Sequence, residues 1–167
     1  MFLNSPTFKI NIIGIFIGIS AILSIISTFT NYWLVYNVRF YGIVDHIGII
    51  PYHSGRFGWF EAASVLMFAS LALFVPLIVV YAFVWRKVYH NGCSHGIRPL
   101  IRVISILSTL ITCLQLVTFV LFAVNSFHRV GNANQTLGSS AYMAISSAVL
   151  MGIPVAFSSH VLRYDCH

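Results

Sequence analysis

Four long runs of apolar residues alternate with short segments that carry nearly all of the charged residues. The runs cover residues 10–29, 60–85, 103–127 and 137–159. An α-helix rises about 1.5 Å per residue, so about 20 apolar residues are enough to cross the hydrocarbon core of a bilayer. The pattern therefore predicts four membrane-spanning helices, and no linker or repeat divides residues 1–167 into further domains.

Lysine and arginine residues are distributed unequally between the two sides of the predicted bundle. One side carries six of them: Lys9, Arg86, Lys87, Arg98, Arg102 and Arg163. The other side carries three: Arg39, Arg56 and Arg129. Short loops that are rich in lysine and arginine stay in the cytoplasm. We therefore expect a multi-pass protein of the plasma membrane with both termini in the cytoplasm.

The two connections expected outside the cell differ in length. The first, residues 31–59, is long and rich in β-forming residues; residues 35–41 partly alternate between polar and apolar, and residues 46–50 fit a second strand. The second, residues 128–136, is short and polar, and its triplet Asn134-Gln135-Thr136 makes Asn134 a candidate glycosylation site. The expected fold class is an all-α membrane protein, a four-helix bundle with a small extracellular β-sheet in the first outer loop.

Composition supports a membrane protein and argues against other classes. The chain is 59% hydrophobic and 7% charged, whereas soluble domains carry about a quarter charged residues. The excess apolar surface must face lipid. The formal net charge is +6, but the basic residues lie between the apolar runs rather than on a polar domain. They orient the chain in the membrane, so we expect contact with membrane lipids and no binding of nucleic acid.

The sequence holds no arrangement typical of a catalytic or cofactor site. The chain has only three acidic residues, Asp45, Glu61 and Asp165, from which no paired carboxylates or Ser-His-Asp arrangement can be assembled. None of the seven histidines lies in the middle of an apolar run, which argues against a haem held between helices. Asp45, His46 and His53 also fit an outer metal site, but solvated loop residues are the favoured interpretation. We expect a non-enzymatic protein without cofactor or metal.

The three cysteines suggest lipidation rather than disulfide bonding. Cys93, Cys113 and Cys166 form no CxxC motif, and their odd number excludes a complete set of internal disulfides. Cys93 and Cys166 lie near the predicted cytoplasmic face, which makes them candidates for S-palmitoylation. Cys113 lies in the middle of the third run, where we expect it to be a small buried hydrophobic residue.

Small residues recur at helical spacing in the first and fourth runs. Gly14 and Gly18 form a GxxxG pattern. In the fourth run a small residue stands at every fourth position: Ser140, Ala144, Ala148, Gly152 and Ala156. Helices in lipid associate by close backbone approach, which small residues permit. We predict that these residues pack within the protein's own bundle, and docking onto the membrane helices of a partner is the alternative.

The third run carries four polar residues on one helical face: Ser105, Ser108, Thr112 and Gln115. A side-chain amide inside lipid is costly unless it has a hydrogen-bond partner. We therefore expect these residues to form hydrogen bonds between helices, with a polar permeation path as the alternative.

Four spans, a long first outer loop rich in β-forming residues and a short second outer loop resemble the superfamily of claudins, peripheral myelin proteins, epithelial membrane proteins and calcium-channel gamma subunits. Residues 61–67 (EAASVLM) look like the family's Q-A-A-R-A-L-M segment at the start of the second span. Residues 101–104 (IRVI) are similar to its basic start of the third span, and residues 137–142 (LGSSAY) resemble its G-x-[SA]-x-[YF] opening of the fourth. Trp33 stands where the family places a tryptophan just beyond the first span. The resemblance covers nearly the whole chain.

The first outer loop departs from the family pattern. Residues 55–59 (GRFGW) hold a glycine and a tryptophan in a different order from the family's G-L-W, and the two cysteines that follow in the family are missing. The resemblance therefore implies a divergent member without the loop disulfide. We expect aromatic packing, a partner, or both to order this loop. The candidate residues of this partner-binding loop are Trp33, Phe40, Tyr41, Tyr52 and Trp59.

The resemblance implies a non-enzymatic tetraspan protein with one of two main functions. The first is an auxiliary subunit or organiser of a membrane channel or receptor complex, which the small-residue stripes favour. The second is a cell–cell junction or adhesion protein that self-associates at cell contacts through its outer loops, which the aromatic loop favours. A small channel or transporter is a weaker third hypothesis. The final residues 164–167 lack the hydrophobic terminus that PDZ domains bind, which argues against a barrier-forming claudin.

The distribution of basic residues predicts the membrane topology. An epitope tag at either terminus should bind antibody only after the plasma membrane is permeabilised, because both ends are expected in the cytoplasm. Immunofluorescence of intact and permeabilised cells measures this accessibility. Staining of intact cells at one terminus alone would require an odd number of spans and would contradict the four-span topology.

Overall fold

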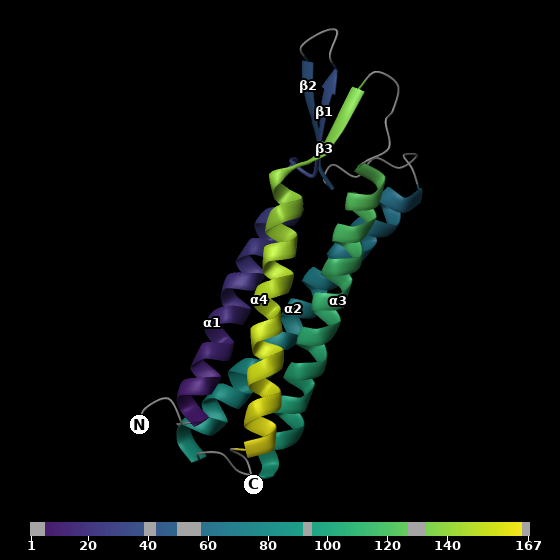
Figure 1. The fold of residues 1–167 in the computed structure, drawn as a ribbon. Coiled ribbons are helices and arrows are strands. Elements are labelled where there is room, and N and C mark those ends of the chain that lie inside the picture. The colour runs from purple at the N-terminus through teal and green to yellow at the C-terminus, as the bar shows by residue number, and fades with distance from the viewer. Residues whose placement is uncertain (1–5, 39–42, 50–57, 92–94, 127–132, 165–167) are drawn as a thin grey trace.

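The computed structural model of the protein describes residues 6–38, 43–49, 58–91, 95–126 and 133–164. Within these residues four helices are long and apolar enough to cross a membrane, as the hydrophobic pattern predicts. The helices are α1 (Pro6–Phe29), α2 (Gly58–Asn91), α3 (Arg98–Ser126) and α4 (Ser139–Tyr164), and a short 3-10 turn, η2 (His95–Ile97), precedes α3. Figure 1 shows that α1 begins and α4 ends at the same end of the bundle.

Each of the four helices extends beyond its predicted apolar run at one end or both; α1 begins at Pro6 and α4 ends at Tyr164. α2 ends at Asn91 rather than at residue 85, and α3 begins at Arg98 rather than at residue 103. The predicted boundaries followed the first charged residues, but arginine and lysine are good helix formers and do not end a helix. With 34 residues, α2 is roughly 50 Å long, which exceeds the roughly 30 Å hydrocarbon core. Its last turns therefore carry basic side chains beyond the apolar part of the bundle.

α4 lies along both α1 and α3, and α2 packs against α3 and, over a shorter length, against α1 (Figure 1). The buried apolar side chains form two clusters. One cluster, around Ile17, Leu77 and Met151, occupies the part of the bundle nearer the start of α1. The other, around Trp33 and Phe122, lies at the opposite end. Many large apolar side chains of α1, α2 and α3 face outward, as expected for helices surrounded by lipid.

A three-stranded antiparallel sheet stands beyond the far end of the bundle (Figure 1). Its strands are β1 (Leu34–Val38), β2 (Ile43–Ile47) and β3 (Ala133–Leu137), in the order β2-β1-β3. The small sheet expected in the first outer loop is confirmed, although its second strand lies three residues before the predicted 46–50. The sequence does not predict the third strand, because its residues, ANQTL, have little β-propensity. They become a strand by pairing with the edge of β1.

The start of α4 is tied to the end of α1 by backbone contacts. The Gly138 N–H donates to the Trp33 carbonyl oxygen at 2.9 Å, and the Ser140 N–H donates to the Tyr32 carbonyl oxygen at 3.1 Å. A Cβ at Gly138 would collide with the Tyr32 carbonyl group, so only glycine allows this approach. Figure 1 shows β3 leading directly into α4. The junction joins the sheet to the bundle.

Replacing Gly138 with alanine should therefore destabilise the protein. The added methyl group has to push α4 away from the Tyr32 backbone, and overpacking of this kind costs about 1–3 kcal/mol. The matched control is Gly18→Ala, because a Cβ at Gly18 meets no atom within 4 Å. Thermal unfolding of the detergent-purified variants should show a lower midpoint for Gly138→Ala and an unchanged or higher midpoint for Gly18→Ala. Equal midpoints would mean that the junction relaxes without cost.

Candidate functional site

An aromatic platform lies under the sheet. Trp33 is fully buried, and its indole Nε1–H donates to the Ser27 carbonyl oxygen at 2.7 Å. The ring centroids of Trp33 and Phe122 are 4.6 Å apart, and Phe122 also makes edge-on contacts with Trp59 and Phe60 at 5.6 and 5.7 Å. Such aromatic pairs add stabilisation beyond the area they bury. The platform packs the start of α2 and the end of α3 against Trp33, the residue that precedes β1.

The structure brings together two of the five aromatic residues proposed for a partner-binding loop. Trp33 and Trp59 both pack on Phe122. Trp33 is wholly buried, so the expectation that it contacts a partner directly has to be corrected. The other three residues, Phe40, Tyr41 and Tyr52, lie outside the described residues. Phe122 was missed by the sequence analysis, because nothing distinguishes it from the other apolar residues of its span.

Hydroxyl and amide groups form a polar seam inside the bundle. The Gln115 amide Nε2 of α3 donates to the Ser24 hydroxyl of α1 at 3.0 Å. From α4, the Ser147 hydroxyl donates to the Ser20 carbonyl oxygen at 2.8 Å. The Ser27 hydroxyl of α1 donates in turn to the Ser140 carbonyl oxygen at 2.7 Å. Three helices are thus joined by hydrogen bonds where hydrophobic packing provides no driving force.

The seam agrees with only part of the polar face expected on the third span. Gln115 forms the expected interhelical bond. The Thr112 hydroxyl instead donates to the Ser108 carbonyl oxygen of its own helix at 2.9 Å, and Ser105 is only partly buried. The α1 partners were missed, although Ser20, Ser24 and Ser27 follow the spacing of one helical face. That spacing was the available signal.

Three buried atoms of the seam region have no hydrogen-bond partner among the described residues: Ser20 Oγ, Ser108 Oγ and Gln115 Oε1. Each is an oxygen, and a serine hydroxyl also carries a proton to donate. An unpaired buried polar group costs about 1–3 kcal/mol. The seam therefore joins three helices although three of its buried oxygens have no hydrogen-bond partner among the described residues.

The small-residue stripe of the fourth span divides between the interior and the surface. Ser140, Ala144 and Ala148 are buried, whereas Gly152 and Ala156 are exposed. Each step of four residues turns a helix by about 40° more than a full turn, so five positions at this spacing drift by roughly 160° around the axis. The inner face continues instead through Met151, Pro154, Ser158 and Val161. The expectation that the whole stripe packs inside the bundle is therefore wrong for its last two residues.

The two glycines of the GxxxG pattern also differ. A Cβ at Gly14 would collide with the Tyr81 hydroxyl of α2, which donates to the Ile10 carbonyl oxygen at 3.3 Å. A Cβ at Gly18 would meet nothing within 4 Å. Gly14 therefore permits a close contact between α1 and α2, and Gly18 does not.

The remaining candidate residues are scattered. The backbone of Asn134 lies in β3 opposite Asn37, and Cys93 and Cys166 lie outside the described residues. Cys113 is exposed on α3, which corrects the expectation that it is buried. In the described part of the chain no three histidine, cysteine or acidic side chains gather closely enough to hold a metal ion.

A comparison with protein families gives a match over nearly the entire chain. The family model described as tight junction protein, claudin-like, matches residues 3–167. The chain belongs to this claudin-like family. The resemblance inferred from the short segments is thereby confirmed, and the protein is a multi-pass membrane protein with four helices of spanning length among its described residues. A search of curated proteins found no significant match.

The structure gives a physical reason for one family-like segment of this claudin-like protein. Residues 137–142 resemble the opening of the family's fourth span, and here they form the junction in which the Gly138 N–H donates to Trp33. Ser140, in the same segment, accepts from Ser27 and contacts the Thr30 hydroxyl at 2.7 Å. The glycine of the segment is therefore needed for the close approach, and the Ser140 hydroxyl adds a contact with Thr30 there.

The division of the α4 stripe predicts opposite results for two leucine substitutions. Ala148→Leu inserts a bulky side chain at a fully buried site and should cost about 1–3 kcal/mol of stability. Ala156→Leu adds the same atoms at an exposed site of the same helix and should leave stability almost unchanged, because leucine is compatible with lipid. Thermal unfolding midpoints of the detergent-purified variants measure the difference. If both variants unfold like the parent protein, α4 does not pack through this face.

Proposed function

We propose that this claudin-like protein is a non-enzymatic auxiliary subunit or organiser of a membrane channel or receptor complex. It would act in the plasma membrane with both termini in the cytoplasm. The observation that carries the proposal is the outward face of α4, where Gly152 and Ala156 are exposed beside lipid. These are the positions of the small-residue stripe that the protein's own helices do not cover.

The outward face of α4 differs from those of the other helices. Its exposed residues between positions 146 and 159 are short or slender: Ser146, Val149, Gly152, Ala156 and Ser159. The outward faces of α1 and α2 carry bulkier side chains, among them Ile15, Ile22, Phe68 and Phe83. A smooth helical face lets a second backbone come close, which is how helices associate inside lipid.

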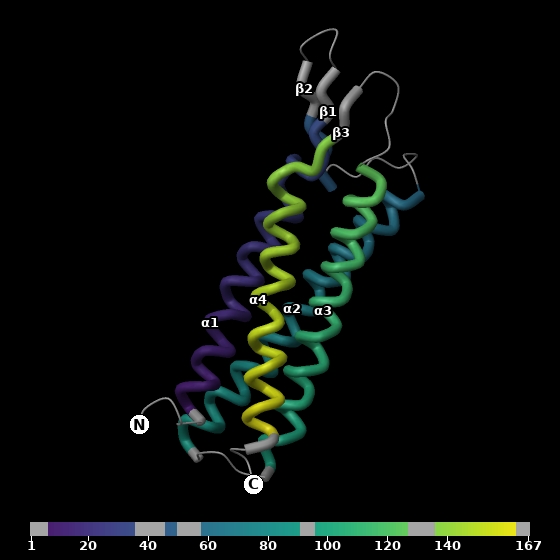
Figure 2. The backbone as a smooth tube through the Cα atoms, viewed as in Figure 1, coloured from purple at the N-terminus to yellow at the C-terminus, as the bar shows by residue number. Residues whose placement is uncertain are grey.

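The position of α4 also suits docking. It runs between α1 and α3, so its outward face forms the middle of one side of the bundle (Figure 2). A Cβ added at Gly152 would meet nothing within 4 Å, so this surface is open. A partner helix could therefore lie against α4 without displacing α1 or α3.

The proposal predicts that bulky residues on this face remove the partner and spare the fold. Gly152→Leu and Ala156→Leu should each release the partner subunit during purification in mild detergent, because the added side chain separates the two backbones. Val75→Leu on α2 is the control, since Val75 is also exposed but lies away from α4. The readout is the native size of the complex and the channel or receptor subunits identified in it by mass spectrometry.

A second candidate, a cell–cell junction protein, is favoured by the sheet. β2 and β3 are the outer strands of the three-stranded sheet, and each has one edge to which a strand of another chain can be added. Co-culture of cells expressing the protein with cells lacking it separates the two functions. Enrichment only where both neighbouring cells express the protein, with no channel or receptor subunit copurifying with the unaltered protein, would favour the junction role and refute the auxiliary role.

A further inference from the structure

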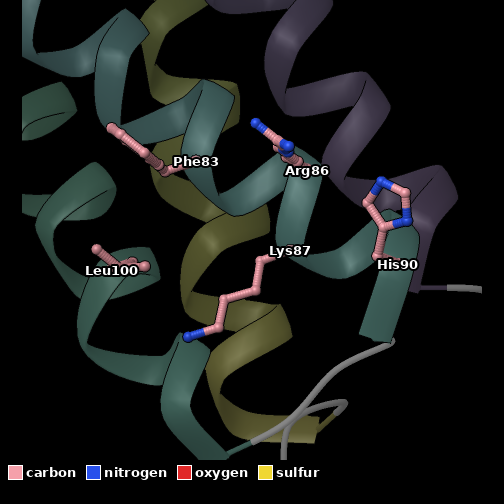
Figure 3. Close-up of a pocket in the computed structure, with 5 residues that line it drawn as sticks. All are labelled: Phe83, Arg86, Lys87, His90 and Leu100. Atoms are coloured by element: carbon pink, nitrogen blue, oxygen red, sulfur yellow. The ribbon is translucent and has the colours of Figure 1, made fainter.

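A groove of about 510 Å³ opens at the end of the bundle where α2 finishes and α3 begins. Figure 3 shows the side chains that line it. Phe83, Arg86, Lys87 and His90 come from the last turns of α2, and Leu100 comes from the first turn of α3. The volume falls in the range of sites that hold small molecules or head groups.

The lining changes from apolar to basic along the direction out of the membrane. Phe83 is 64% exposed and belongs to the apolar part of α2. One turn later the chain presents Arg86 and Lys87, and a further turn brings His90. On the same turns Trp85 stacks on Tyr89 with ring centroids 5.7 Å apart, and such aromatic pairs concentrate at the boundary between lipid tails and head groups. The groove therefore lies across this boundary.

Among the described residues no acidic side chain balances the positive charge in the groove. Glu61, the one acidic residue whose side chain the structure describes, lies in the first turn of α2, at the opposite end of that helix. Among the described residues neither Arg86 nor Lys87 forms an ion pair. Both side chains are exposed. Two unpaired cations at a lipid surface favour an anionic ligand.

The turn that follows α2 adds to this preference. The Lys87 ammonium lies 3.6 Å from the position that a Cβ of Gly96 would occupy, so it lies over η2. α3 begins directly after η2, and the aligned peptide dipoles of a helix give its start a partial positive charge. Leu100 brings this turn to the wall of the groove.

We propose that the groove binds the head group of an anionic phospholipid. The lipid head group lies against the basic side chains of Arg86, Lys87 and His90 along the last turns of α2, and an acyl chain follows Phe83 and Leu100 toward the membrane interior. A soluble phosphate compound would use the basic side chains alone and would leave these apolar walls uncovered. Anionic lipids are concentrated in the cytoplasmic leaflet, the side on which the basic-residue distribution places this end of the protein. The site does not depend on the auxiliary-subunit role.

The test uses the full chain purified in mild detergent and titrated with phosphatidylinositol bisphosphate, with bound lipid counted by native mass spectrometry. Arg86→Gln should weaken binding about fivefold, and Arg86→Gln combined with Lys87→Gln should weaken it more than tenfold. The matched control is Arg102→Gln, which removes the same charge from an exposed position of α3 outside the groove. It should change the affinity less than twofold.

Two results would overturn the proposal. If Arg86→Gln and Arg102→Gln weaken binding equally, the lipid responds to overall charge and not to this groove. If soluble inositol trisphosphate binds as tightly as the lipid, the apolar walls contribute nothing and the ligand is a free phosphate compound. Phosphatidylcholine serves as the neutral lipid, and its binding should be the same for all four proteins. The altered residues are all exposed, so equal elution in size-exclusion chromatography establishes that each variant is folded.

Discussion

The backbone contact between the start of α4 and residues 32–33 is the interaction on which the rest of the architecture depends. Two hydrogen bonds join Gly138 and Ser140 to the carbonyl oxygens of Trp33 and Tyr32. Because β1 follows Trp33 directly and β3 precedes Gly138, the same contact aligns the two strands and places α4 along α1. The sheet and the membrane bundle are therefore one connected unit, although they lie in solvents as different as water and lipid.

The aromatic platform explains how a claudin-like fold holds its sheet when residues 31–59 contain no cysteine. A disulfide would stabilise such a loop mainly by restricting the unfolded chain. Here Trp33 is anchored by a hydrogen bond to Ser27, and Phe122 lies against three other aromatic rings. A third strand from the second outer loop widens the sheet, which matters because a two-stranded hairpin alone is marginal in water.

Polar residues and small residues have different places in the bundle. Several hydroxyl and amide groups face inward, where Gln115 and Ser147 bond across helices, whereas Ser146 and Ser159 of α4 are exposed. Small residues serve both sides: Ala148 allows close packing inside, and Ala156 leaves a smooth outer face. At the end of α2 the basic residues leave the hydrocarbon region as part of a continuous helix. The protein thus presents a face of small side chains on α4 and a basic groove at the end of α2, and the two surfaces lie on different helices.

By itself the sequence determined the class of fold, because apolar runs as long as residues 60–85 are stable only inside a membrane. It also indicated the strand near residue 35 and the family. Only the tertiary structure decided which face of α4 is buried. Positions spaced four residues apart drift around a helix, and the buried face of α4 is the one that contacts α1 and α3. The tertiary structure also decided the third strand, whose residues pair because β1 offers an edge, and the groove, whose walls come from Lys87 and Leu100 on different helices. Contacts between residues distant in the chain depend on how the helices pack, which local periodicity does not specify.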